Sequence, residues 1–286
     1  MNSIYGVQDL PGRKERYGVV RGDVDEDVDV CVIGSGAGGA VVAKKMCDYG
    51  RSVVVLEKGG YYDGEDMNQR DEDMIPLLWK NAGANFNDDL SVAIGQGECL
   101  GGSTVINDAV CFPIPPIVRR QWRELGVRIS DEEWDAATDE VQLQIHVTKV
   151  REDELNRNNQ MLRKGCEVMG FKIHYANSRN CIDCMQCGLC HLGCHYETKQ
   201  DMRVTYLHRA LNDPKSDIRV YCDCSAEKLE HEDGRVKRVV GEFRDRDEWL
   251  IGRITVRAKI IVVAAGAIAS SHLLLKNRIG PGRVGR

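Results

Sequence analysis

Apolar residues in this 286-residue chain gather in short runs that polar and glycine-rich segments separate. Two runs, residues 30–33 and 53–56, are continuous and rich in valine, which is typical of strands buried on both faces of a parallel sheet. A glycine-rich turn and a short helical segment fit between them. The pattern therefore predicts a strand–helix–strand unit that begins at Val28.

The second half of the chain carries another set of strand signals. Residues 218–263 contain apolar runs of strand length, with a turn at Asp233 and Gly234 that predicts a hairpin. The last run, residues 260–263, leads into a tight turn and then into a helix that contains Leu273. Together with the first unit, these elements predict an α/β fold.

The remaining segments set the predicted domain organisation. Residues 1–27 are polar and include an acidic run, so they are expected to form an N-terminal arm outside the fold. Residues 28–118 and 200–286 are predicted to form the main α/β domain. Residues 119–199 are predicted to be an inserted segment with surface helices, one of them with Asp131 as its N-cap.

Composition narrows the classes of function. Hydrophobic residues make up 42% and charged residues 29% of the chain, and the formal net charge is −5, so nothing points to a nucleic-acid partner. No apolar run approaches the roughly 20 residues of a membrane span, and no signal peptide is expected. The twelve cysteines are then expected to be reduced thiols of a soluble, cytoplasmic protein.

The turn after the first strand has the chemistry of a dinucleotide site. Gly34 permits the tight turn, Gly36 lets the backbone approach a pyrophosphate, and Gly39 lets the helix pack closely on the strand. The helix N-terminus then offers free N–H groups to the phosphates. Glu57 ends the second strand, where an acid accepts hydrogen bonds from a ribose hydroxyl and repels a 2′-phosphate. The unit is thus expected to bind FAD or NAD rather than NADP.

A second glycine-rich segment spans residues 95–107. Its glycines again allow a close approach of the backbone to a ligand. Residues 61–94, which precede it, show little periodicity and are expected to form an extended excursion over the bound nucleotide.

These segments together resemble the glucose-methanol-choline (GMC) family of FAD-dependent oxidoreductases. The resemblance rests on four blocks in the right order: the glycine fingerprint with Glu57, residues 101–107 followed by Trp122, residues 205–207, and residues 264–268 followed by Leu273-Leu274-Leu275 and Ile279-Gly280. It implies an α/β, Rossmann-like FAD-binding domain with an incomplete second subdomain on the substrate side.

The resemblance also implies which residues contact the cofactor. The first block would hold the ADP part of FAD, the second would contact the pyrophosphate and approach the isoalloxazine, and the strand near Ala226 would read the adenine. The implied FAD-binding residues are Gly34, Gly36, Gly38, Gly39, Glu57, Gly102, Ser103, Asn107, Ala226 and Ala265.

No catalytic base is assigned in this sequence. In the family, the catalytic histidine and its partner lie in a C-terminal half, and this chain ends just before that half would begin. Its seven histidines lie in segments that do not match the family's catalytic motif. We therefore expect that a partner chain supplies the catalytic half or that the chain is a truncated product, with little activity of its own.

Five cysteines gather in the loop 181–194. Four of them have the bacterial ferredoxin spacing of two, two and three intervening residues, which predicts an iron–sulfur cluster. Two departures from the ferredoxin pattern leave the ligand assignment ambiguous. His195 stands where ferredoxins have proline, and in ferredoxins the fourth cysteine of the run serves a second cluster. Either Cys181 or Cys194 could therefore be the fourth ligand. A zinc site and a metal-free turn are the alternatives. The candidate ligands are Cys181, Cys184, Cys187, Cys190 and Cys194.

The function implied by the resemblance is FAD-dependent oxidation of the CH–OH group of an alcohol or sugar. Electrons would leave the flavin through an iron–sulfur cluster if one is bound. NAD-dependent hydride transfer is an alternative, against which residues 101–107 argue. The non-enzymatic alternative is an FAD-binding, electron-transfer subunit that needs a partner chain for its substrate.

Overall fold

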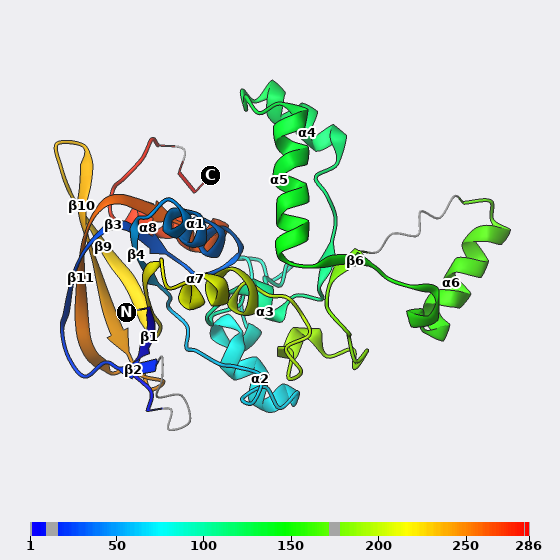
Figure 1. Cartoon of the computed structure of the whole chain (residues 1–286), viewed down its shortest axis with the longest axis horizontal. Helices are drawn as coiled ribbons and strands as arrows, with labels where there is room; N and C mark the ends of the chain where they lie inside the picture. The colour runs from blue at the N-terminus through cyan, green and yellow to red at the C-terminus, as the bar shows by residue number, and fades with distance from the viewer. Residues whose placement is uncertain (1, 10–16, 172–177, 283, 286) are drawn as a thin grey trace. The chain divides into compact units, whose positions relative to one another are not determined.

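The computed structural model describes residues 2–9, 17–171, 178–282 and 284–285. The chain divides into two compact units, whose elements are shown in Figure 1. Unit 1 comprises residues 1–107, 189–197 and 201–286, and unit 2 comprises residues 108–188 and 198–200. The second unit therefore begins at Asp108, ahead of the boundary expected at residue 119.

An eight-stranded sheet forms the framework of unit 1. Its strands are β1 (Ser3–Gly6), β2 (Tyr17–Val19), β3 (Val24–Ile33), β4 (Ser52–Leu56), β8 (Asp217–Tyr221), β9 (Cys224–Glu232), β10 (Arg235–Arg244) and β11 (Leu250–Val263). They lie in the order β2-β1-β8-β4-β3-β11-β10-β9. Neighbours from β2 to β11 are parallel, whereas β10 is antiparallel to both β11 and β9.

Unit 1 also contains helices between and after these strands. They are α1 (Ala37–Asp48), α2 (Asp71–Leu78), α3 (Ser103–Ile106), α7 (His208–Asn212) and α8 (Gly266–Lys276), with 3-10 turns at Lys80–Gly83 and Cys190–Leu192 and a short π-helix at Arg203–Leu207. Helix α1 joins β3 to β4 and packs on both strands. The strand–helix–strand unit predicted from the apolar runs is therefore present.

Much of the N-terminal segment 1–27, expected to be an arm, instead belongs to the sheet through β1, β2 and the start of β3, while residues 1 and 10–16 lie outside the described residues. Strand β1 pairs in parallel with β8, next to the Asn2 side chain, which donates to the Asp213 carbonyl at 2.9 Å. The same side chain accepts a hydrogen bond from the Ile218 N–H at 3.2 Å. Strand β3 also begins at Val24 rather than at Val28. Backbone pairing with a distant strand, which no local pattern reveals, brings this polar segment into the fold.

The three aspartates of β3 form ion pairs with basic residues of β11, its neighbour in the sheet. Arg257 lies 3.1 Å from Asp25 and 2.9 Å from Asp27, and Lys259 lies 2.7 Å from Asp29. These acids alternate with more buried positions along β3, as side chains on opposite faces of a strand must. Because charged residues occupy so many positions of residues 24–29, the alternation typical of a strand is not recognised from the sequence.

Strand β11 links a hairpin to the parallel part of the sheet. Residues 254–257 pair with β10 on one side and with β3 on the other, whereas residues 260–263 pair with β3. The predicted turn at Asp233 and Gly234 joins β9 to β10. The strands and hairpin expected in the second half are thus observed.

Residues 61–94 differ from the extended excursion expected, because they contain α2 and a 3-10 turn. Asp71, Glu72 and Asp73 fill the first turn of α2, where acids stabilise a helix through its dipole. Met74 and Leu78, one helical turn apart, are buried.

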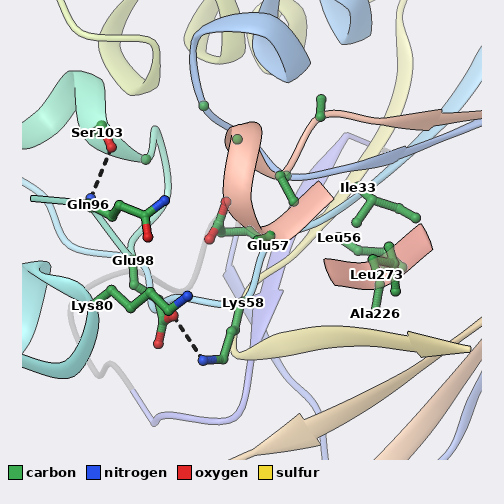
Figure 2. Close-up of a pocket in the computed structure, with 18 of the residues that line it drawn as sticks. Ile33, Leu56, Glu57, Lys58, Lys80, Gln96, Glu98, Ser103, Ala226 and Leu273 are labelled. Carbon is green, nitrogen blue, oxygen red and sulfur yellow. Dashed lines mark hydrogen bonds and ion pairs between the residues drawn. The ribbon is translucent and has the colours of Figure 1, made fainter. Parts of the chain in front are cut away.

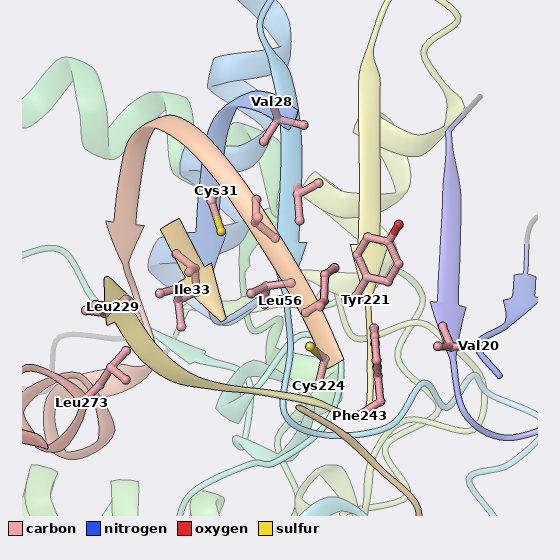
Figure 3. Close-up of a cluster of buried hydrophobic side chains, with 14 residues drawn as sticks. Val20, Val28, Cys31, Ile33, Leu56, Tyr221, Cys224, Leu229, Phe243 and Leu273 are labelled. Atoms are coloured by element: carbon pink, nitrogen blue, oxygen red, sulfur yellow. The ribbon is translucent and has the colours of Figure 1, made fainter. Parts of the chain in front are cut away.

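A large hydrophobic cluster of unit 1 is built mostly from side chains of the sheet strands, with Leu273 of α8 at one edge (Figure 3). The ring of Tyr221 lies 5.8 Å from that of Phe243, and Ile33, Leu56 and Leu273 belong to the same cluster. This packing fixes the carboxyl ends of β3 and β4, from which the predicted site segments begin.

The described part of unit 2 combines three α-helices and a 3-10 turn at Glu152–Glu154 with a small antiparallel sheet. The helices are α4 (Pro116–Glu124), α5 (Asp131–Gln144) and α6 (Arg157–Val168), and the sheet has the order β5 (Val110–Cys111), β7 (Ser178–Asn180), β6 (Val147–Lys149). Ser130, not Asp131, is the N-cap of α5, since its hydroxyl accepts from the Glu133 N–H at 3.1 Å in a capping box. Over the described parts of both units, no helix has the length and apolar character needed to cross a membrane.

Candidate functional site

The first glycine-rich loop leaves β3 at the carboxyl edge of the sheet. Gly34 has a φ of +98°, and a Cβ there would lie 2.6 Å from the Ala264 carbonyl oxygen. A Cβ on Gly39 would lie 1.8 Å from the Gly34 carbonyl oxygen. Both positions therefore need glycine so that backbone segments can meet.

Gly36 and Gly38 face open space instead. A Cβ at either position would meet no atom within 4 Å, and both residues line a cavity. No side chain caps the N-terminus of α1, and its first turn holds no acid. The positive end of the helix is therefore suited to an anionic ligand at this cavity.

Glu57, at the end of β4, is held by hydrogen bonds to both carboxylate oxygens. Its Oε2 accepts from the N–H and the hydroxyl of Ser35, at 2.9 and 2.5 Å. Its Oε1 accepts from the Gly59 N–H at 2.9 Å. Burial raises the pKa of this carboxyl, while the bonds from Ser35 and Gly59 oppose that rise.

The second glycine-rich segment meets the first loop. Gly102 has a φ of +56°, and a Cβ there would lie 3.0 Å from the Gly36 Cα. The Gly101 N–H donates to the Ser35 hydroxyl at 2.9 Å, although these residues are 66 positions apart in the sequence. The two segments thus form one continuous wall.

They enclose a cavity of about 800 Å³ in unit 1, a volume typical of cofactor and small-molecule sites. Ile33, Leu56, Ala226 and Leu273 lie together on one side of it, from strands β3, β4 and β9 and helix α8 (Figure 2). Of the predicted FAD-binding residues, those that line it are Gly34, Gly36, Gly38, Glu57, Gly102, Ser103, Asn107, Ala226 and Ala265. Gly39 packs beneath the loop instead.

Several polar residues of this region were not predicted from the sequence. Lys58, Lys80, Gln96 and Glu98 line the cavity, with Lys58 Nζ 2.9 Å from Glu98 (Figure 2). Ser35 is fully buried behind the wall. The glycines and Glu57 nearby in the sequence indicate that these segments belong to the site. They do not indicate which side chains face the cavity, because side-chain directions in loops depend on tertiary contacts.

The five cysteines of the loop 181–194 fall in both units. Cys181, Cys184 and Cys187 belong to unit 2, and Cys190 and Cys194 belong to unit 1. Among the residues that the structure describes, no group of three or more His, Cys, Asp or Glu side chains is placed to hold a metal ion. The iron–sulfur cluster therefore stays a prediction from the cysteine spacing alone.

Comparison with known proteins identifies the fold. The model of the GMC oxidoreductase family matches residues 28–286. The chain belongs to the GMC oxidoreductase family. Two solved structures with 16% sequence identity share its fold: formate oxidase from Aspergillus oryzae RIB40, from work on its FAD modification, and pyridoxine 4-oxidase from Mesorbium loti. Their TM-scores are 0.63 and 0.64, covering 93% and 88% of this chain and 49% and 52% of theirs. These findings confirm the predicted Rossmann-like α/β fold of GMC type.

Relatives with similar sequences are longer than this chain. A long-chain-alcohol oxidase of Arabidopsis thaliana is 30% identical over 269 residues, which cover 90% of this chain and 35% of the relative. An uncharacterized GMC-type oxidoreductase of Mycobacterium tuberculosis (strain CDC 1551 / Oshkosh) is 29% identical over 262 residues, covering 88% and 39%. The GMC chain described here thus spans well under half the length of these two relatives.

Proposed function

We propose that the cavity of unit 1 binds FAD and that the chain is the flavin-binding part of an oxidoreductase acting on the CH–OH group of an alcohol. The observation that carries this proposal is the continuous wall formed by the two glycine-rich segments beside Glu57. Membership of the GMC family and the similarity to a long-chain-alcohol oxidase support it.

The residues of the wall fit the parts of FAD. The N-terminus of α1 and the open space beside Gly36 and Gly38 suit a pyrophosphate, which needs N–H donors and close backbone approach. Glu57 would accept a hydrogen bond from a ribose hydroxyl at Oε1, because this oxygen accepts only the Gly59 N–H and has a second lone pair. Ala226 leaves room for a flat adenine along β9. Bound FAD would supply the hydride acceptor for alcohol oxidation.

The substrate side of the reaction is a wider proposal. We infer that an alcohol rather than a sugar is the substrate, since the relative with 30% identity is an alcohol oxidase. A base outside residues 28–286 would take the hydroxyl proton, supplied by further sequence or by a partner chain. The rival proposal is a non-enzymatic, FAD-binding electron-transfer subunit that needs a partner chain for its substrate. It predicts that alcohol oxidation appears only when the partner chain is added.

The test is the absorbance spectrum of anaerobically purified protein from about 300 to 700 nm, before and after dithionite, followed by chromatography of the heat-released cofactor. We expect flavin bands that bleach on reduction and a released compound that co-elutes with FAD. Released NAD, or a colourless protein that takes up no added FAD, would contradict the proposal.

A further inference from the structure

Ser35 holds three parts of the candidate FAD site together without lining the cavity. It is fully buried, and its N–H and hydroxyl both donate to Glu57 Oε2. Its hydroxyl oxygen also accepts from the Gly101 N–H at 2.9 Å. The hydroxyl is thus used as donor and as acceptor at the same time, which a serine can do and an alanine cannot.

We infer that Ser35 is a positioning residue for FAD, which fixes the Glu57 carboxylate and docks the second glycine-rich segment on the first. This inference rests on the proposed function. It assigns an effect on the cofactor to a side chain that does not touch it.

The consequence for Glu57 is geometric. With Oε2 held by two donors of Ser35 and Oε1 held by the Gly59 N–H at 2.9 Å, the carboxylate is fixed, so the remaining lone pair of Oε1 keeps one direction. A ribose hydroxyl would meet an acceptor already in place, and little conformational entropy would be lost on binding. Without the Ser35 hydroxyl, Oε2 keeps one of its two donors.

The consequence for the second segment is equally direct. The Gly101 N–H is buried beside a close backbone contact, since a Cβ on Gly102 would lie 3.0 Å from the Gly36 Cα. A buried N–H that loses its acceptor is costly. Without the Ser35 hydroxyl, we expect the segment that carries Ser103 and Asn107 to move away from the first loop.

A pH effect distinguishes positioning from simple packing. Burial raises the pKa of Glu57, the Ser35 and Gly59 hydrogen bonds lower it, and the charge of Glu98 raises it. Loss of the Ser35 hydroxyl therefore raises the pKa of Glu57 further, and the ionised acceptor is lost at a higher pH. Of the other groups close by, the thiols of Cys222 and Cys224 are themselves neutral, because burial raises their pKa values well above the ordinary range.

The experiment measures the Kd for FAD by flavin fluorescence between about pH 5.5 and 8.5. The variants are Ser35→Ala, Ser35→Cys, Glu57→Gln and the double variant Ser35→Ala/Glu57→Gln. Ser35→Cys replaces the hydroxyl with a somewhat larger thiol that forms weaker hydrogen bonds, so it serves if the alanine variant does not fold. Ser216→Ala, a buried serine of unit 1 that does not line the cavity, is the matched control.

We expect Ser35→Ala to weaken FAD binding about tenfold at pH 7 and to move the loss of affinity on acidification to higher pH. In the Glu57→Gln background, Ser35→Ala should weaken FAD binding much less and should not shift the pH profile. Ser216→Ala should bind FAD with the affinity of the unchanged protein. Unchanged Kd values and pH profiles for both Ser35 variants, or full additivity with Glu57→Gln, would overturn the inference alone. Failure of the unchanged protein to bind FAD at any pH would overturn the proposed function as well.

Discussion

The glycines of the first loop are needed for two different reasons. Gly34 and Gly39 are required by the protein itself, because a Cβ at either would collide with a backbone oxygen. Gly36 and Gly38 border open space, and their lack of a side chain serves a ligand rather than the fold. The two groups therefore respond differently to substitution by alanine.

Gly36→Ala separates these demands. Gly36 has a φ of −68°, which alanine adopts without strain, and nothing lies within 4 Å of the new methyl group. We expect the stability to change by less than about 1 kcal/mol, as for an N-cap glycine. FAD affinity should fall by about tenfold or more, since the methyl group occupies space that the pyrophosphate needs.

Denaturant unfolding and FAD titration of the same preparation would check both expectations. Gly165→Ala, in helix α6 and also with nothing within 4 Å of the new methyl group, is the matched control and should leave FAD affinity unchanged. Equal Kd values for Gly36→Ala and this control would show that no ligand approaches the Gly36 backbone.

At the scale of elements, the first strands are part of the sheet that carries the site. Strand β1 lies beside β8, and β8 lies beside β4, which ends directly before the candidate acid Glu57. The ring of Tyr5 stacks on that of Tyr221 at 5.0 Å with an angle of 17° between them. Packing at this end of the sheet therefore supports the strand that presents Glu57.

Tyr5→Ala tests that role. Loss of the stacked, partly buried ring should lower the free energy of unfolding by about 2 kcal/mol. The control Tyr49→Ala removes a ring that is 70% exposed and should change it by less than about 0.5 kcal/mol. Urea unfolding followed by circular dichroism measures both. An unchanged midpoint for Tyr5→Ala would mean that the first residues form an arm outside the folded core.

At the scale of the whole molecule, the chain combines a GMC flavin-binding fold with a cysteine-rich loop divided between its two units. The loop has ferredoxin spacing at its last four cysteines. Cys181 and Cys194 are buried and Cys187 is exposed. The spacing predicts an iron–sulfur cluster, and a metal-free turn is the alternative.

Iron and acid-labile sulfide in anaerobically purified, reconstituted protein decide between them. From the ferredoxin spacing we expect about two or more irons per chain with an equal amount of sulfide, lost together in a Cys184→Ala/Cys187→Ala variant. Fewer than about two irons per chain, with a visible spectrum that flavin explains entirely, would contradict the cluster that the spacing predicts.

The sequence by itself determined the parts of this protein whose physics is local. Continuous valine-rich runs specify the buried strands β3 and β4, and the turn between them needs glycines within a few residues of one another. The order of the motif blocks was enough to identify the GMC family. The same local information, together with the family resemblance, located Glu57 and eight of the other residues that line the cavity.

Tertiary structure decided what depends on distant partners. The hydrogen bond from Gly101 to Ser35 joins residues 66 positions apart, and the acids of β3 become strand residues through their pairing with Arg257 and Lys259. The same holds for β1, whose partner β8 lies more than 200 residues further along the chain. Such contacts produce no periodic pattern in the sequence, because their partners are far apart along the chain and meet only when it folds.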